Sequence, residues 1–204
     1  MLSIAAEFDR FQQLWRSLPR RTHTLLPCRR DITPGVFGDL LHHMCLGERS
    51  SADHLKLIYA GSGFERNAGF AAMGVNYYDV VPEQFLSAIK RFHQNLFTAP
   101  CAAYVGDLVT STMGNHYLHH TLHLPITDDS GNPCYLLVFG LDRKPASDLG
   151  DRLRDSVGES NIKDLAYLDL GAGTPSGYVS DFTLRPGKAG ITTSHALCPL
   201  AMPT

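Results

Sequence analysis

The stretch that decides the fold is residues 54–81, HLKLIYAGSGFERNAGFAAMGVNYYDVV. It opens with an apolar run, Leu55–Ala60, that is typical of a strand, and it continues through a Gly-Ser-Gly turn at residues 61–63. A short helix is expected around Phe64–Asn67. Residues 70–81 then place aromatic and apolar side chains among glycines, which suits short turns that line an apolar cavity.

The glycines of this stretch first have to be tested as a dinucleotide-binding loop. Gly61 and Gly63 follow a strand, but the fingerprint G-x-G-x-x-G needs a third glycine where this chain has Arg66. The next glycine, Gly69, comes too late for close packing of a strand on a helix. The role that remains is conformational, because two glycines allow the chain to leave the strand in a tight turn.

Composition favours one domain with extensions over two domains. The chain has 204 residues with 44% hydrophobic content, and one domain usually takes about 100–200 residues. Its 18 Lys and Arg are balanced by 20 Asp and Glu. Since no basic excess is present to neutralise a phosphate backbone, we expect no nucleic-acid partner.

The cysteines and the N-terminal residues bear on the compartment. The cysteines form no C-x-x-C pair, which is typical of reduced thiols in a cytosolic protein. Residues 1–15 carry Glu7, Asp9 and Arg10, a pattern that does not fit the apolar core of a signal peptide. No window approaches the ~18 apolar residues of a membrane span. We therefore expect a cytoplasmic protein with no membrane partner.

Three parts are expected along the chain. Residues 1–18 form an N-terminal amphipathic helix, which packs either on its own domain or on its copy in a homodimer. Residues 19–145 form the domain, and residues 146–204 form a C-terminal extension. The extension is expected to be partly disordered because Gly, Pro, Ser and Thr dominate after Gly171. Within it, residues 162–170 suggest a short strand or a strap lying on the domain.

Inside the domain, segments in which apolar residues recur every two residues, as in strands, alternate with segments in which they recur every 3.6 residues, as in helices. Thr33 and Pro34 give a helix-entry signal. The elements predicted after it are a short helix at 35–42, a hairpin of strands at 44–49 and 55–60, the short helices, a long amphipathic helix at 83–97, and strands at 101–111, 116–126 and 134–141. The run TDDSGN at 127–132 predicts the turn of the last hairpin.

Three sequence words in this order carry a family resemblance. They are Leu26-Pro27-Cys28-Arg29-Arg30-Asp31-Ile32-Thr33-Pro34, then Tyr59-Ala60-Gly61 with Gly69, Gly74 and Asp79, then Leu124-Pro125 through Gly131 with Phe139-Gly140. On these words the chain resembles PAS domains, and in particular stand-alone bacterial PAS-like proteins, over about residues 14–142. The resemblance implies an α+β fold: a five-stranded antiparallel sheet with short helices and one longer helix on one face.

The resemblance also implies a function. A small molecule or cofactor of unknown identity would bind between the helices and the sheet, and the role would be sensing, dimerisation or protein interaction in signalling, without catalysis. The sequence after residue 142 shows no histidine-kinase, helix-turn-helix or cyclase signature. We therefore expect a regulatory module without its own output domain, which acts through an unidentified signalling partner protein, as a homodimer. The candidate pocket residues, chosen as aromatic or polar groups beside the expected cavity, are Tyr59, Phe64, Phe70, Tyr77, Phe92 and His120.

Four closely spaced histidines form the only group of residues in the sequence that suggests a metal site. His116, His119, His120 and His123 would share one face of a helix, but a strand places 116 and 120 on one face and 119 and 123 on the other. The alternation of leucines here favours the strand, so we expect partly exposed histidines and no bound metal. A metal or haem site and a pH-responsive site remain as alternatives.

Other residues give weaker evidence for a bound haem or flavin. His93 lies in the long helix, where a haem sensor could place an axial ligand, but we expect it at the surface or boundary. No cysteine lies in the asparagine-cysteine-arginine-phenylalanine sequence of flavin photosensors. Cys28, beside two arginines, is expected to be a plain free thiol.

The alternative function is that of a small α+β isomerase or dehydratase with an apolar pocket. Such an enzyme needs an acid and a base that converge, and Asp107, Tyr59, Tyr104 and His120 are the candidates. Topology discriminates between the two: a two-stranded hairpin before the long helix favours the PAS fold, and three initial helices before a curved sheet favour the isomerase fold.

Overall fold

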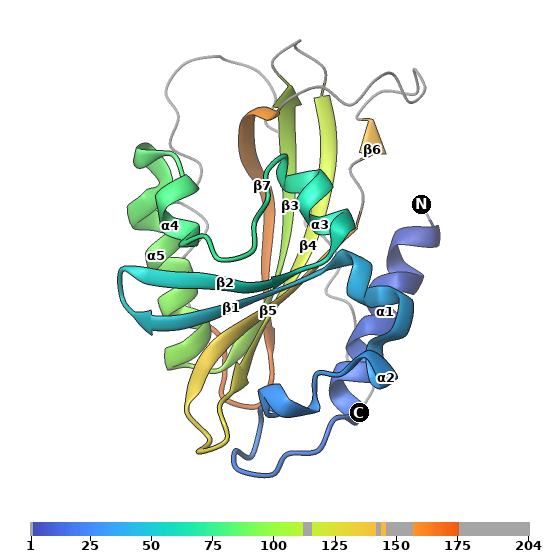
Figure 1. Ribbon diagram of the computed structural model, residues 1–204, viewed down its shortest axis with the longest axis vertical. Coiled ribbons are helices and arrows are strands. Elements are labelled where there is room, and N and C mark those ends of the chain that lie inside the picture. Colours follow the sequence, from blue (N-terminus) through green and yellow to red (C-terminus); the bar gives the residue numbers. More distant parts are fainter. Residues whose placement is uncertain (1, 112–115, 142–143, 146–156, 176–204) are drawn as a thin grey trace.

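The computed structural model describes residues 2–111, 116–141, 144–145 and 157–175, and its centre is one antiparallel sheet (Figure 1). The strands run in the spatial order β2-β1-β5-β4-β3-β7, and β6 pairs with β4 beside this path. Their bounds are β1 Met44–Ser51, β2 His54–Ala60, β3 Cys101–Ser111, β4 His116–Thr127, β5 Pro133–Gly140, β6 Lys144–Pro145 and β7 Val157–Asp169. Each strand predicted inside the domain is present, within one or two residues.

Helices occupy the predicted segments. Their bounds are α1 Leu2–Ser17, α2 Pro34–Phe37, α3 Ser62–Ala68, α4 Tyr77–Val80 and α5 Glu83–Thr98, with 3₁₀ turns at Arg29–Asp31 and Gly38–His43. Thr33 is the N-cap of α2 and Pro34 its first residue, as predicted. The helix expected over 35–42 is shorter and passes into the 3₁₀ turn at Gly38, whose φ of 52° only glycine adopts readily. No helix in the described ranges is long and apolar enough to cross a membrane.

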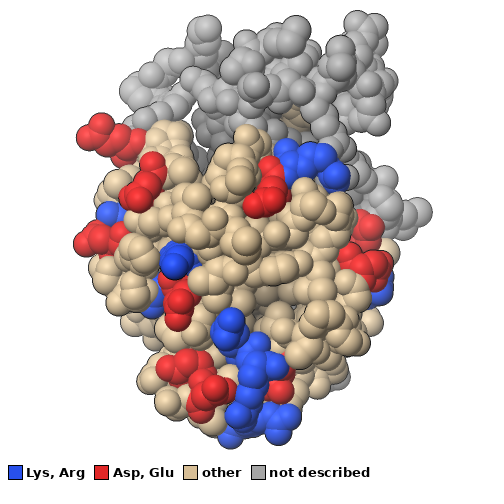
Figure 2. All heavy atoms as spheres, in the orientation of Figure 1, with Lys and Arg blue, Asp and Glu red and all other residues tan. Residues whose placement is uncertain are grey.

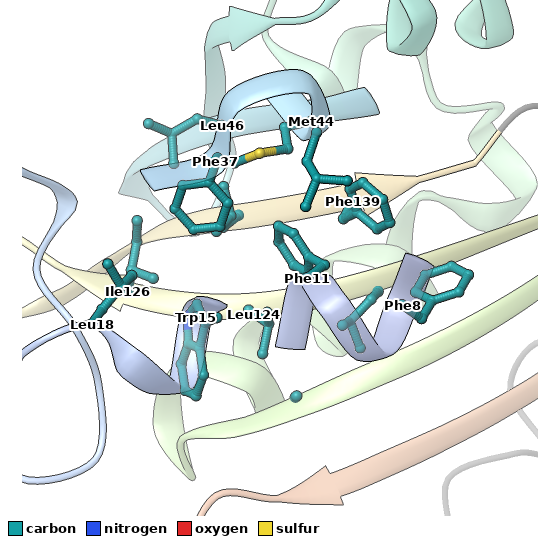
Figure 3. Close-up of a cluster of buried hydrophobic side chains, with 14 of the residues drawn as sticks. Phe8, Phe11, Trp15, Leu18, Phe37, Met44, Leu46, Leu124, Ile126 and Phe139 are labelled. Atoms are coloured by element: carbon teal, nitrogen blue, oxygen red, sulfur yellow. The ribbon is translucent and has the colours of Figure 1, made fainter. Parts of the chain in front are cut away.

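One face of the sheet is covered by α1 and α2. Phe11 of α1 is fully buried and stacks on Phe139 of β5, with ring centroids 4.5 Å apart. Figure 3 shows Phe8, Phe11 and Trp15 pointing from α1 toward the sheet, with Phe37 above them. The N-terminal helix therefore buries its apolar stripe on its own sheet.

The opposite face is covered by α3, α4 and α5 (Figure 1). Phe92 and Leu96 of α5 pack on Ala103 and Val105 of β3, and Tyr78 of α4 belongs to the same cluster. A smaller cluster around Cys45 and Leu57 lies under α3 and the segment that follows it. This is the side of the sheet on which the resemblance to PAS domains leads us to expect a pocket.

The sheet differs from the prediction in two respects. It has seven strands where five were expected, because β7 pairs with β3 from Cys101 to Ser111 and β6 adds two residues. Helices also cover both faces, since α1 and α2 lie opposite the predicted helical layer. The strand or strap suggested at 162–170 is thus part of a sheet strand. Of the tail expected from Gly171 onward, residues 176–204 lie outside the described residues.

Gly61 and Gly63 follow β2 at a point where neighbouring atoms leave no room for a side chain. A Cβ on Gly61 would lie 2.2 Å from the Leu41 carbonyl oxygen, and one on Gly63 would lie 2.7 Å from the His42 ring. Neither glycine has a positive φ. The predicted conformational role is therefore wrong: these residues let α3 lie directly on the 3₁₀ turn before β1.

Candidate functional site

Two histidines and a tyrosine meet between α5 and the sheet. His93 projects from the middle of α5 and is only 2% exposed. The hydroxyl of Tyr78 in α4 lies 3.2 Å from its Nδ1. The ring of His123 in β4 lies 6.2 Å, centroid to centroid, from that of His93. Three different elements thus bring polar rings into one buried layer.

Aromatic side chains surround this pair of imidazoles. Phe92 lies edge-on to His123 with ring centroids 5.2 Å apart, and Tyr77 lies 5.6 Å from His93. Tyr167 of β7 lies 6.2 Å from Phe92, and its hydroxyl is 3.4 Å from the Asn95 amide. The layer is apolar except at these few ring nitrogens and hydroxyls, which is the composition typical of small-molecule sites.

Burial keeps these groups uncharged. It lowers the pKa of His123 to about 4, and it lowers the pKa of His93 well below the usual value, with His123 and Arg49 acting in the same direction. Burial also raises the pKa of Tyr78 to about 12 and that of Tyr77, where the charge of Asp107 adds to the effect. At neutral pH the site therefore holds two neutral imidazoles and two neutral phenols.

One atom of this layer lacks a partner. Nε2 of His123 lies 3.0 Å from the hydroxyl of Thr121, but its Nδ1 is buried without a hydrogen bond to any described residue. A buried polar atom left unpaired costs about 1–3 kcal/mol, so such atoms usually meet a water or a ligand. Because a neutral imidazole nitrogen can donate or accept according to tautomer, the site can bind either an acceptor or a donor.

The six predicted pocket residues fall on both faces of the sheet. Tyr77 and Phe92 belong to the imidazole layer, and Phe64 and Phe70 pack in the adjoining cluster under α3, which Tyr77 also contacts. Tyr59 packs on the α1 side and its hydroxyl donates to the Leu41 carbonyl. His120 contacts Tyr104 there too. Including Tyr59 and His120 in one pocket was therefore wrong, because the alternation of side chains turns them to the other face.

Comparisons with known proteins find likeness in solved structures alone. No protein-family model and no curated protein matches the chain. It is similar to an RNA-binding light-oxygen-voltage receptor at 20% identity over 62% of this chain and 36% of the other, with a TM-score of 0.40. It is similar to VqmA bound to DPO at 18% identity over 48% of this chain and 51% of the other, with a TM-score of 0.36. It is similar to the Rhodobacter sphaeroides light-oxygen-voltage protein at 12% identity over 70% of each chain, with a TM-score of 0.38. The chain spans about a third of the length of the RNA-binding receptor and about half of the length of VqmA.

The decisive observation is the chain's own topology. The hairpin of β1 and β2 precedes α3, α4 and the long α5, and the three strands β3, β4 and β5 follow and join it in a single antiparallel sheet. The chain has a PAS-like fold. The α5 face, which carries the imidazole layer, is the face on which the PAS resemblance expects a ligand.

Within this PAS-like fold, His93 is the residue that sequence reasoning misplaced. It was expected at the surface, yet it lies at the centre of the α5 interface. Its spacing already indicates this: His93 is four residues after Ile89 and seven after Leu86, so it shares their side of the helix. Counting the helical face by position, without regard to polarity, would have placed it inside.

The strand histidines separate as predicted. His120 faces α1, whereas His123 faces α5, and the side chain of His116 lies outside the described set. Among the described residues no three metal-ligating side chains come together. A haem ligated by His93 does not fit this arrangement, because the rings of Tyr77, Tyr78, Phe92 and His123 all lie within 6.2 Å of it.

The residues proposed for acid and base catalysis do not converge. Tyr104 and His120 meet on the α1 face, Tyr59 lies three strands away in the sheet order, and Asp107 alternates with Tyr104 to the opposite face. The thiol of Cys28 is 1% exposed and contacts the Asp129 carboxylate at 3.2 Å. Burial raises its pKa, which keeps it a protonated thiol as expected.

Charged side chains on the surface are mixed in sign. On the face shown in Figure 2, Lys and Arg lie close to Asp and Glu. Arg21 and Asp31 are 3.4 Å apart and Arg30 and Asp129 are 3.5 Å apart. Such pairing reduces the positive potential that a phosphate backbone would require. The absence of a nucleic-acid partner stays a prediction.

Proposed function

We propose that the chain is a PAS-like sensory module that binds a small, uncharged molecule between α5 and the sheet. The observation that carries this proposal is the unpaired Nδ1 of His123, buried in an aromatic layer on the side of the sheet where the fold family places ligands. A ligand atom that bonds this nitrogen would remove the cost of leaving it unsatisfied.

The chemistry of the layer limits the ligand. Neutral imidazoles and phenols offer hydrogen bonds but no net charge, and the rings of Phe92, Tyr77 and Tyr167 offer flat apolar walls. A charged molecule would lose its hydration without gaining a counter-charge there. The fitting class is therefore a flat or aromatic molecule with one or two polar atoms.

Signal output would pass through a partner. Tyr167 in β7 contacts both Phe92 and Asn95 of α5, so a ligand that moves α5 would also act on β7 at the edge of the sheet. We propose that a signalling protein or a second copy of the chain reads this change, and that the chain itself performs no catalysis.

The test compares two histidines of the same strand. The full chain is purified as wild type, His123→Phe and His120→Phe, and the molecules that each releases on unfolding are identified by mass spectrometry. We expect one small molecule, close to one per chain, from the wild type and from His120→Phe, and at least about tenfold less from His123→Phe. Equal recovery from all three proteins, or none from any, would contradict the proposal.

A further inference from the structure

The sheet has two outer strands, β2 and β7, and they differ in how their outer edges are bonded. On β2, the backbone N–H of Leu57 donates to the Val75 carbonyl, and the N–H of Gly74 donates to the Leu57 carbonyl. On β7, no described backbone segment other than β3 bonds to residues 164–169. Figure 1 shows β7, in orange, beside β3. Within the described ranges, β7 is therefore the open edge of the sheet.

Residues 164–169 form the regular part of this edge. Their pairing with β3 runs without a shift from Gly106 to Cys101, and both irregularities of the pairing lie earlier in β7. In an antiparallel strand every second residue directs its N–H and C=O away from the neighbouring strand, so a regular edge can accept a further strand. Four apolar side chains of this part are only partly buried: Leu165, Ala166, Tyr167 and Leu168. A strand added here would bond the backbone and cover these side chains.

The sequence of this edge is complementary to itself. An antiparallel copy centred on Ala166 places Leu165 opposite Tyr167 of the second copy, on the face that α5 covers. Ala166 then lies opposite its own copy, where its small side chain leaves room at the axis. Lys163 lies opposite Asp169 of the second copy, which gives an opposite-charge pair on each side of the axis. Moving the centre to Tyr167 would instead place Leu165 opposite the exposed Asp169.

We propose that the chain forms a homodimer in which residues 164–169 pair antiparallel with the same residues of a second copy, so that the two sheets join into one. The helices leave room for this arrangement, because α5 packs on Ala103 and Val105 of β3, one strand in from the edge. Two β7 strands would hold the two β3 strands about 14 Å apart, at about 4.8 Å per strand, which exceeds the ~10–12 Å diameter of a helix. A symmetric pair of this kind closes at two copies.

This pairing names the second copy as the partner that reads the state of the imidazole layer. Tyr167 lies 6.2 Å from Phe92 of that layer, and in the dimer it would also lie opposite Leu165 of the second copy. A ligand between α5 and the sheet of one copy would therefore act across the axis on the other. This coupling rests on the proposed function, whereas the pairing itself needs no ligand.

An engineered disulfide tests the axis of the dimer. Opposed residues of an antiparallel pair have Cα atoms about 4.5–5.5 Å apart, which a disulfide can span. Full-length Ala166→Cys is treated with oxidised glutathione beside the wild type and Lys56→Cys, and linked dimers are followed on non-reducing gels. Lys56 is the matched control, because it is exposed on the other outer strand, where it bridges to Asn76. We expect Ala166→Cys to form linked dimers at least about tenfold faster than either control.

Sedimentation equilibrium measures the dimer itself, on the full chain as purified and again after unfolding, extraction of small molecules and refolding. We expect a dimer in both samples. Ala166→Glu should weaken it about tenfold or more, because two carboxylates would lie directly opposite each other, and Lys56→Glu should leave it unchanged. Circular dichroism shows whether Ala166→Glu stays folded, and the disulfide decides the question if it does not.

Three results would overturn the proposal. A monomeric wild type would mean that other residues of the chain or a different protein cover β7. A dimer that a folded Ala166→Glu leaves intact, or equal cross-linking of the two cysteine variants, would place the interface elsewhere. A dimer that forms in both samples while no small molecule is recovered would uphold the pairing and contradict the proposed function alone.

Discussion

Acid should weaken the fold through His123, and the size of the effect follows from its burial. The imidazole has a pKa of about 4 in the folded chain against an ordinary 6.5. Since the folded state binds a proton less readily than the unfolded state, stability is complete above about pH 6.5 and falls as the pH drops toward 4. At pH 5.0 the unfolded imidazole is almost fully protonated and the folded one mostly is not, which costs about 2 kcal/mol.

The assay is urea unfolding of the full chain at pH 7.5 and pH 5.0, for the wild type and for His123→Phe. Phenylalanine keeps a ring against Phe92 but cannot take up a proton. Carboxylates and histidines distant from His123 change the stability of both proteins, and their contributions cancel in the comparison, whereas His93 is coupled to His123 and is compared separately in a His93→Phe variant. We expect the wild type to lose about 2 kcal/mol more than the variant between the two pH values. An equal loss in both proteins would refute the conclusion that burial keeps His123 neutral.

Three further substitutions test the packing that places the site. Gly61→Ala should destabilise the chain by about 1–3 kcal/mol in urea unfolding, because its Cβ would lie 2.2 Å from the Leu41 carbonyl oxygen; a neutral effect would show that α3 is not packed so closely. Phe11→Ala should cost about 3–5 kcal/mol in the same assay, since the ring is fully buried on Phe139, and a loss below about 1 kcal/mol would mean that α1 does not pack on its own sheet. Tyr78→Phe should cost only about 0.5–1.5 kcal/mol, the value of its contact with His93, and no change would show that the hydroxyl is not bonded there.

The elements that the sequence predicted well are those specified by local signals. The helix at 83–98 has a continuous apolar face, and the last hairpin is specified by the turn at 127–132 between two alternating strands. Each of these signals lies within the residues that form the element. The order of the elements then sufficed to predict an antiparallel sheet with a hairpin ahead of the long helix.

The features that were missed, such as the full length of β7 and its pairing with β3 beyond the short strand or strap suggested at 162–170, depend on contacts between distant residues. β7 reads VGESNIKDLAYLD, in which polar residues interrupt the apolar alternation, and its pairing with β3 joins residues about sixty positions apart. Such an edge strand leaves no strong local signal. Its inclusion raised the strand count above the five that were predicted.

The candidate site was only half predictable, because both faces of the sheet are covered. Tyr77 and Phe92 were chosen as aromatic residues beside the expected cavity, and they lie in the imidazole layer. His120 was predicted on the same ground. It lies two and four residues before Leu122 and Leu124, however, and therefore shares their face of the sheet, which is covered by α1. The alternation of side chains along a strand shows which residues share a face of the sheet. Which of the two faces carries the candidate site depends on the helices that pack on it.

The most direct test of the central claim is the environment of His123 Nδ1 itself. Long-range ¹H–¹⁵N NMR spectra of the histidine rings are recorded on the full chain as purified, and again after unfolding, extraction of small molecules and refolding. We predict that the Nδ1 resonance of His123 differs between the two samples as a hydrogen bond to the ligand is lost, while that of His120 stays unchanged. Identical His123 resonances in both samples would contradict the account of this face as a ligand site.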